Sequence, residues 1–257
     1  MSRSLDLSIA PYGVVRQHTY DMAILPWGAT EPHNLHLPYL TDAILSHDVA
    51  VSAAELALER FGTRVMVLPP LCMGAQNPGQ RDLPFCIHYS ETTQRALLFD
   101  IVASLHHQGM RKLLIVNGHG GNSFKGIIRD LAVQYPDFML LSSEWFTVLP
   151  AKEWFDEPGD HADELETSVM MHYHPELVRL EDAGPGQAHP FALPSLRQKV
   201  AWLPRHWSLT TSDTGIGNPH LATAEKGRRF ALAVAERYAQ LCHELAAVTT
   251  VEELYEK

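Results

Sequence analysis

Short apolar runs alternate with stretches of helical periodicity along this chain, and this alternation restricts the fold more than any other feature of the sequence. The apolar runs predict strands over residues 22–28, 64–69, 112–117 and 138–142. The helical patterns predict helices over residues 42–60, 90–109, 124–135, 162–174 and 222–247. Strands separated by helices pair in parallel, because a parallel connection needs a long crossover. We therefore expect an α/β fold with a mainly parallel sheet and crossover helices, with residues 1–257 as a single domain.

Composition and charge exclude several classes of protein. The chain is 46% apolar and 19% charged, which is typical of a globular protein. Its 20 Lys and Arg against 30 Asp and Glu give a formal net charge of −10, which argues against nucleic acid and anionic membrane surfaces as partners. No stretch is long and apolar enough for a signal peptide or a membrane span, so we expect a cytoplasmic protein. The cysteines lack the spacing of a disulfide framework or a cysteine zinc site.

Polar loops that carry histidine follow two of the predicted strands. The sequence EPHNLH, residues 31–36, follows the first strand, and GHGGN, residues 118–122, follows the third. In an open parallel sheet, ligands bind beyond the carboxyl ends of the strands. We therefore expect the two loops to form one site, and the fifteen histidines of the chain direct attention to metal binding.

The first loop contains four potential metal ligands, Glu31, His33, His36 and Asp42. Glu31 and His33 are two residues apart, so on an extended segment their side chains point the same way. Carboxylates together with imidazoles suit zinc, manganese or iron. The structural alternatives are that Asp42 caps the following helix and that His36 is a packing residue.

In the second loop, three glycines surround His119 and allow the backbone to approach a bound group closely. The alternatives are that His119 is a turn residue, or that the loop binds phosphate. The spacing matches neither G-x-x-x-x-G-K-[ST] nor G-x-G-x-x-G, which disfavours the phosphate loop. We therefore interpret His119 as a metal ligand.

A third group of polar residues, 160–168, opens the fourth predicted helix. Glu166 falls on the apolar stripe of this helix, where an unpartnered carboxylate is costly, so a metal ion or a cationic substrate is the expected partner. Alternatively, Asp163 and Glu166 form a helix capping box. His161, with an ordinary pKa of about 6.5, is a candidate for proton transfer.

These motifs resemble, in order, the signatures of the creatininase (creatinine amidohydrolase) family. The resemblance rests on residues 25–42 (LPWGATEPHNLHLPYLTD), on NGHGGN at 117–122, on ETS at 166–168 with His161 before it, and on GNP and ATAEKG between residues 217 and 227. Each motif alone is only moderately specific, but the ordered set spans most of the chain.

The resemblance implies a creatininase-like fold of three α/β/α layers, often assembled as a homo-oligomeric hexamer, with two divalent metal ions per chain. Carried over by position, Glu31 binds the first metal, His33 the second, Asp42 bridges them, and His119 completes the first. In creatininase a glutamate two positions after that histidine serves the second metal, but this chain has Gly121 there, and Glu166 is our candidate for the missing ligand. We expect zinc first, with manganese or iron as alternatives.

The activity that the resemblance implies is metal-dependent hydrolysis of a non-peptide C–N amide bond, cyclic or linear, in a small-molecule substrate. A hydroxide that bridges the metals would attack the carbonyl carbon. His161 would protonate the departing nitrogen, and Glu166 would hold the second metal or orient the water. Creatinine-like amides, formylamino-pyrimidines and the end of a modified peptide are the alternative substrates.

Two functional alternatives to a two-metal amidohydrolase stay open. The chain could be a non-catalytic metal- or nucleotide-binding regulatory module, or a hydrolase with one metal ion. Residues 74–85, which include Asn77, Gln80 and Arg81, depart from the family pattern and predict a pocket that differs from that of creatininase. Residues 226–229 (KGRR) are most simply a solvated helix face.

Overall fold

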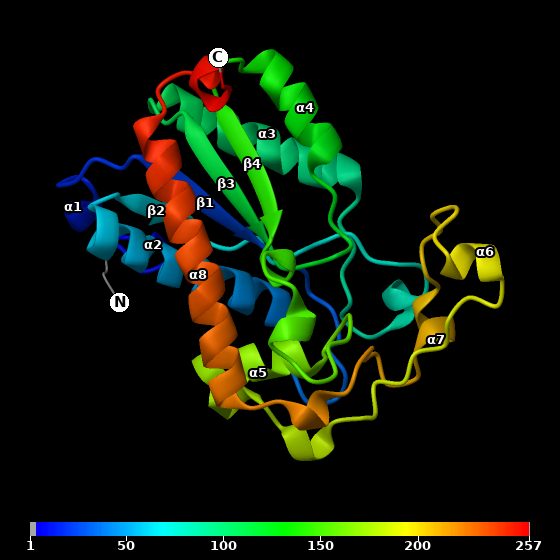
Figure 1. Cartoon of the computed structure of the whole chain (residues 1–257). Coiled ribbons are helices and arrows are strands. Elements are labelled where there is room, and N and C mark those ends of the chain that lie inside the picture. The colour runs from blue at the N-terminus through cyan, green and yellow to red at the C-terminus, as the bar shows by residue number, and fades with distance from the viewer. Residues whose placement is uncertain (1–3, 257) are drawn as a thin grey trace.

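A fully parallel, four-stranded sheet lies between two layers of helices in the computed structural model, which describes residues 4–256 (Figure 1). The strand order is β2-β1-β3-β4. The strands are β1 (Met22–Trp27), β2 (Val65–Val67), β3 (Lys112–Asn117) and β4 (Met139–Glu144). The parallel sheet expected from the sequence alternation is therefore confirmed, with strand ends that differ from the expected ranges by up to two residues.

The two faces of the sheet are covered by different helices. Side chains alternate along β1, so that Ile24 packs with one helix layer and Leu25 with the other. The first layer contains α2 (Thr41–Phe61), α5 (Glu164–Tyr173) and α8 (Ala224–Ala247). The second contains α3 (Glu91–His107) and α4 (Lys125–Gln134). This arrangement gives the three layers that the family resemblance implies.

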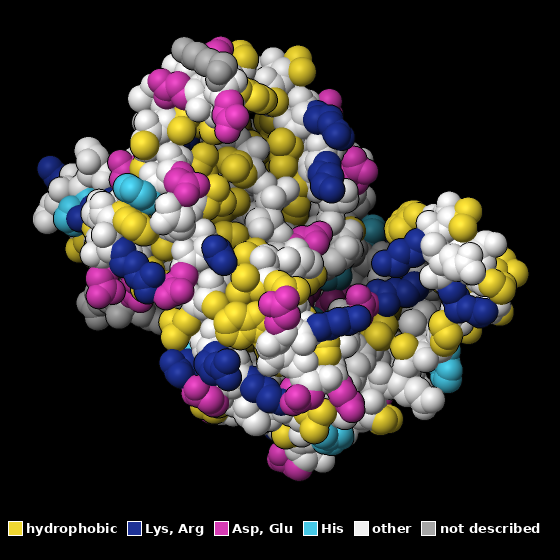
Figure 2. Space-filling view, in the orientation of Figure 1, with side chains coloured by type: hydrophobic (Ala, Val, Ile, Leu, Met, Phe, Trp, Pro, Cys, Tyr) yellow, Lys and Arg dark blue, Asp and Glu magenta, His cyan; other side chains and the backbone are white. Residues whose placement is uncertain are grey.

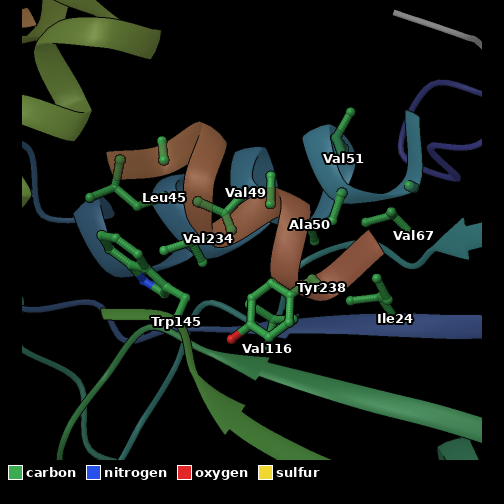
Figure 3. Close-up of a cluster of buried hydrophobic side chains, with 14 of the residues drawn as sticks. Ile24, Leu45, Val49, Ala50, Val51, Val67, Val116, Trp145, Val234 and Tyr238 are labelled. Atoms are coloured by element: carbon green, nitrogen blue, oxygen red, sulfur yellow. The ribbon is translucent and has the colours of Figure 1, made fainter. Parts of the chain in front are cut away.

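The larger apolar core lies between the sheet and the pair α2 and α8. Figure 3 shows Val49 of α2 and Val234 of α8 close together above Ile24 and Val116 of the sheet. Each of these four side chains is fully buried. The position of α2 matters for function, because its first turn carries Asp42 to the carboxyl edge of the sheet.

Residues 181–219 contain only short helices. Residues 188–206, which we call the arm, project from the body of the molecule as the yellow segment that includes α6 in Figure 1. The short α-helices are α1 (Tyr12–Val15), α6 (Pro194–Arg197) and α7 (Trp207–Thr210). Single 3₁₀ turns occur at Gln80–Asp82, Trp145–Thr147, Ala151–Glu153, Pro175–Leu177, Leu180–Asp182, Pro219–Leu221 and Val251–Leu254. Within residues 4–256, no helix has the length and apolar character needed to cross a membrane.

Two of the sequence motifs meet where α8 crosses α5. A Cβ atom added at Gly227 would lie 1.8 Å from the backbone oxygen of Ser168, a distance that no backbone can accept. Glycine at position 227 therefore sets how closely α8 packs on α5. Because α5 also carries Glu166, this contact helps to fix the position of that carboxylate.

The substitution Gly227→Ala is expected to lower the free energy of unfolding by about 1–3 kcal/mol, because the added methyl group forces the two helices apart. Gly126→Ala in α4 is the matched control, since a Cβ atom there meets nothing within 4 Å. Alanine favours the helix by up to about 1 kcal/mol at such a site, so the control should be stabilised. Chemical denaturation of both variants tests this, and equal stabilisation of the two would contradict the close-packing account.

Candidate functional site

Six buried residues converge at the carboxyl edge of the sheet. They come from the loop after β1, the first turn of α2, the loop after β3 and the start of α5, as the sequence analysis expects for one shared site. Their side chains form three groups in which one ligand atom of each member lies within 4.8 Å of the others. The groups are Glu31, His33 and His161; Glu31, Asp42 and His119; and His33, Asp42 and Glu166.

The three histidines of the cluster are each oriented by a backbone carbonyl. A carbonyl oxygen only accepts, so the ring nitrogen that faces it must carry the proton. The other ring nitrogen of a neutral imidazole then has a free lone pair, as metal-binding histidines require. The three bonds run from His33 Nδ1 to Glu31 O (3.0 Å), from His119 Nε2 to Ala75 O (2.6 Å) and from His161 Nε2 to Pro32 O (2.9 Å).

The free nitrogens of these rings point at carboxylate oxygens. His119 Nδ1 lies 3.0 Å from Glu31 Oε1 and 3.2 Å from Asp42 Oδ2, while His33 Nε2 lies 2.9 Å from Asp42 Oδ1. If the rings are neutral, the lone pairs of their nitrogens face carboxylate oxygens, and both are hydrogen-bond acceptors. Asp42 Oδ2 is moreover a buried oxygen without a hydrogen-bond donor. A positive charge is needed between them, and a divalent cation supplies it with the N and O ligands that zinc and manganese accept. The donor set therefore fits a metal centre.

The pKa shifts of the histidines also show that the buried carboxylates favour positive charge at this site. Burial disfavours a charged His33, but the neighbouring Asp42 outweighs it and raises the pKa of His33 to about 10. Burial also opposes charge on His119, whose pKa is nevertheless raised well above its ordinary value by Glu31 and Asp42. Protons hold the charge when no metal does, so metal binding at this site must displace protons.

Asp42 belongs to two of the three groups and lies between them. The alternative that Asp42 caps α2 is not what the structure has, because the N-cap position is Leu40 and the Asp42 carboxylate faces His33 and His119. Its central position agrees with the bridging role that the family resemblance implies, which stays a prediction.

Glu166 faces the cluster from the first turn of α5. Its Oε2 accepts a hydrogen bond from the Ala162 backbone N–H at 2.6 Å, and burial raises its pKa to about 8 against the lowering effect of His33. The capping alternative is half correct: the Asp163 side chain accepts from the Glu166 N–H, but the Glu166 side chain does not return that bond to Asp163.

His36 lies outside the three groups. Its Nε2 is 2.9 Å from the Thr167 hydroxyl, and burial lowers its pKa to about 4. The packing role that the sequence left open for this histidine therefore agrees with its position.

A side chain at position 121 is sterically excluded in this chain. A Cβ atom at Gly121 would lie 2.2 Å from Ala75 O and 2.4 Å from His119 Nε2. The backbone around Ala75 thus fills the space where a glutamate at position 121 would begin, and it orients His119 from the same place. Glu166 reaches the cluster from another element instead, as expected for a replacement ligand.

Two long-range side-chain contacts, those of Gln80 and Lys226, were not identified from the sequence. Gln80 is buried and donates from Nε2 to Glu31 Oε2 at 2.6 Å, which holds that carboxylate from the side opposite the histidines. Lys226 Nζ pairs with the buried Glu164 carboxylate at 2.5 Å and with Asp156 at 2.6 Å, so the prediction of a solvated face is wrong for this lysine. The spacing of residues in the sequence does not reveal such long-range contacts.

A cavity of about 1310 Å³ opens over the cluster, between the body and the arm. Glu31, His119 and Glu166 line its floor, and His161 and Trp207 stand beside them with their rings at 90° and 5.1 Å apart. Figure 2 shows the hollow between the body and the arm on this face of the molecule. A substrate that enters it reaches the candidate metal ligands directly.

Sequence comparison finds relatives over most of the chain. The family model for creatinine amidohydrolase matches residues 13–242. The chain is 32% identical over 221 residues to the mycofactocin precursor peptide peptidase of Mycobacterium ulcerans (strain Agy99), covering 82% of this chain and 80% of the relative. It is 27% identical over 180 residues to the creatinine amidohydrolase of Pseudomonas putida, covering 62% of this chain and 66% of the relative.

Structure comparison gives the same fold. A crystal structure from Bacteroides fragilis NCTC 9343, provisionally named a creatinine amidohydrolase, is 60% identical, with a TM-score of 0.96 and complete coverage of both chains. A structure of creatininase with manganese is 23% identical, with a TM-score of 0.74, and the match covers 95% of this chain and 100% of that one. The creatininase-like fold expected from the motifs is therefore confirmed.

Gln80→Ala should weaken metal binding by roughly 10–100-fold, as removal of a hydrogen bond that orients a metal ligand typically does. Gln94→Ala is the matched control, because Gln94 is an equally buried glutamine in α3 whose amide donates to Tyr89 O, away from the cluster. Competition with a metallochromic chelator measures the affinity of each variant. Equal affinities of the two variants would refute a positioning role for Gln80.

Proposed function

Because the chain belongs to the creatininase family, we propose that it is a metal-dependent amidohydrolase that cleaves a C–N amide bond in the cavity over the Asp42 cluster. One observation carries the proposal: three buried histidines each direct one ring nitrogen at a backbone carbonyl and the other at a buried carboxylate. The second nitrogens and the carboxylates need positive charge between them, which divalent metal ions would supply with the ligand atoms that such ions prefer.

The proposed ligand sets are those that share Asp42. Glu31 and His119 would hold one divalent ion with Asp42, and His33 and Glu166 the other. When bound, such ions lower the pKa of a water molecule toward about 7 and polarise a carbonyl oxygen. Zinc is the expected metal and manganese or iron an alternative, since all three accept this mixture of imidazole and carboxylate ligands.

His161 is the proposed proton donor to the departing nitrogen. Its Nε2 is fixed by Pro32 O, so the proton that moves would be the one that Nδ1 holds when the ring is protonated, and Nδ1 lies 3.6 Å from Glu31 Oε1. Burial lowers the pKa of His161, which makes the protonated ring a stronger acid. Its place in the cavity wall would bring it to a substrate whose amide lies at the Asp42 cluster.

Creatinine and a precursor peptide, the compounds that the relatives' names contain, both have a C–N amide bond. We propose that the substrate is a non-peptide amide, cyclic or linear. The end of a peptide is the alternative substrate, and a screen of amides and peptides would distinguish the two. We also propose that the chain forms a homo-oligomer, by analogy with the hexamer of the family.

Asp42→Ala should remove both metal ions and abolish amide hydrolysis, because both proposed ligand sets lose their shared carboxylate. Asp48→Ala, a buried aspartate in the same helix that pairs with His174 instead, should keep the metals. Elemental analysis of the folded variants, together with activity on a screened amide, provides the measurement. Retained activity with one metal per chain in Asp42→Ala would disprove the bridging assignment.

His161→Gln should lower kcat by about 10²–10⁴-fold while the metal content stays at the wild-type value, because a proton donor and not a ligand is removed. Metal content and kcat are measured on the same preparations. Loss of metal in this variant would reassign His161 to the ligand set with Glu31 and His33.

A further inference from the structure

The cavity is larger than a small cyclic amide requires. Pockets for drug-sized ligands typically have about 300–1,000 Å³, and this cavity of about 1310 Å³ exceeds that range. One wall is the body with the metal-ligand cluster, and the other is the arm, from which Arg197, Lys199 and Trp202 face the same space. A substrate that fills the cavity extends from the cluster to the arm.

Every carboxylate that lines the cavity already has a partner. Asp160 pairs with Arg205 at 2.5 Å, and Asp163 accepts backbone hydrogen bonds at the start of α5. Under the proposed function, on which this inference rests, the metal ions neutralise the other three, which are Glu31, Asp42 and Glu166.

Two cations of the arm, by contrast, have no acidic partner among the described residues. Arg197 Nη1 donates only to the backbone oxygens of Phe191 (2.9 Å) and Ala192 (3.0 Å). Lys199 forms no ion pair with any carboxylate in residues 4–256. Figure 2 shows Lys and Arg side chains gathered along the hollow between the body and the arm. On a chain of net charge −10, unpaired cations at a cavity wall are a local exception.

Lys199 lies directly after the C-terminal end of α6. Its φ of 58° is the left-handed conformation in which many helices end, and hydrogen bonds from Lys199 N to Leu196 O and from Val200 N to Ser195 O close that end. The end of the helix thus fixes the backbone from which the Lys199 side chain reaches the cavity. Beside it, Trp202 exposes 86% of its surface and lines the cavity, which offers an apolar contact next to the two cations.

We propose that the arm recognises an anionic group of the substrate, a carboxylate or a phosphate, through Arg197 and Lys199 while the amide lies at the Asp42 cluster. The apolar part of the substrate then packs against Trp202. The substrate class is therefore an extended amide with an acidic end.

Binding of three matched probes to the metal-loaded enzyme tests this proposal. N-benzoylglycine carries a carboxylate, N-benzoyl-2-aminoethyl phosphate a phosphate, and N-benzoylglycinamide has a neutral end on the same benzamide. Calorimetry at low ionic strength compares the wild type with Lys199→Gln and with the double variant R197Q/K199Q. Arg237→Gln, an exposed arginine of α8 outside the cavity, is the matched charge control.

The wild type should bind at least one acidic probe more tightly than the neutral one. Lys199→Gln should raise the Kd of that probe about two- to five-fold, as expected for a partly exposed ion pair, and the double variant should raise it further. R237Q and the neutral probe should show no change, and added salt should reduce the difference. An effect confined to the carboxylate or to the phosphate probe identifies which anion the arm recognises.

The proposal is overturned if neither acidic probe binds the wild type more tightly than the neutral one, or if the variants weaken the neutral probe as much. Arg197→Lys keeps the charge and checks that the loss in R197Q/K199Q does not come from a misfolded arm. The two proposals fail separately. Charge-dependent binding without any amide hydrolysis would reject the amidohydrolase function alone, and hydrolysis that ignores the arm cations would reject the anionic substrate alone.

Discussion

The arrangement of the site depends on negative charge that is buried without enough hydrogen-bond donors. Glu31 and Asp42 are almost fully inaccessible, and Glu166 stands beside them. Burying carboxylates is unfavourable unless they are paired, and the nearest candidates for pairing are imidazoles. Because His33 and His119 each donate the one N–H of the neutral ring to a backbone carbonyl, the positive charge that the carboxylates need must come from extra protons or from metal ions. Metal ions satisfy the same atoms and add a chemical function.

The fold brings these groups together through close approaches of backbone. A Cβ atom at Gly28, after β1, would lie 2.3 Å from Ala43 N, and one at Gly118, after β3, would lie 2.3 Å from Asp42 O. The first turn of α2 is therefore seated directly on the ends of the two central strands, which places Asp42 between them. In the same way, Gly227 allows α8 to pack closely on α5, which helps to fix the position of Glu166.

The features that the sequence predicted correctly are those that depend on local residue patterns and on the topology of a parallel sheet. Apolar runs between helical stretches predicted the parallel sheet, and the shared edge of parallel strands brought Glu31, His33 and His119 to one place. It could not predict that Gln80 would reach Glu31 across 49 residues, or that Lys226 would pair with Glu164, because such contacts depend on loop paths. For the same reason, the cations of the arm drew no attention before their position over the cavity was known.

Anomalous diffraction from a crystal grown with zinc or manganese tests the central claim most directly, because it locates the metal ions relative to the ring nitrogens and carboxylates of the cluster. The account predicts peaks on both sides of Asp42, with zinc about 2.0–2.1 Å from His119 Nδ1 and from His33 Nε2. A map without a peak at Asp42, in which these nitrogens remain bonded to the carboxylates as in the metal-free arrangement, would contradict it.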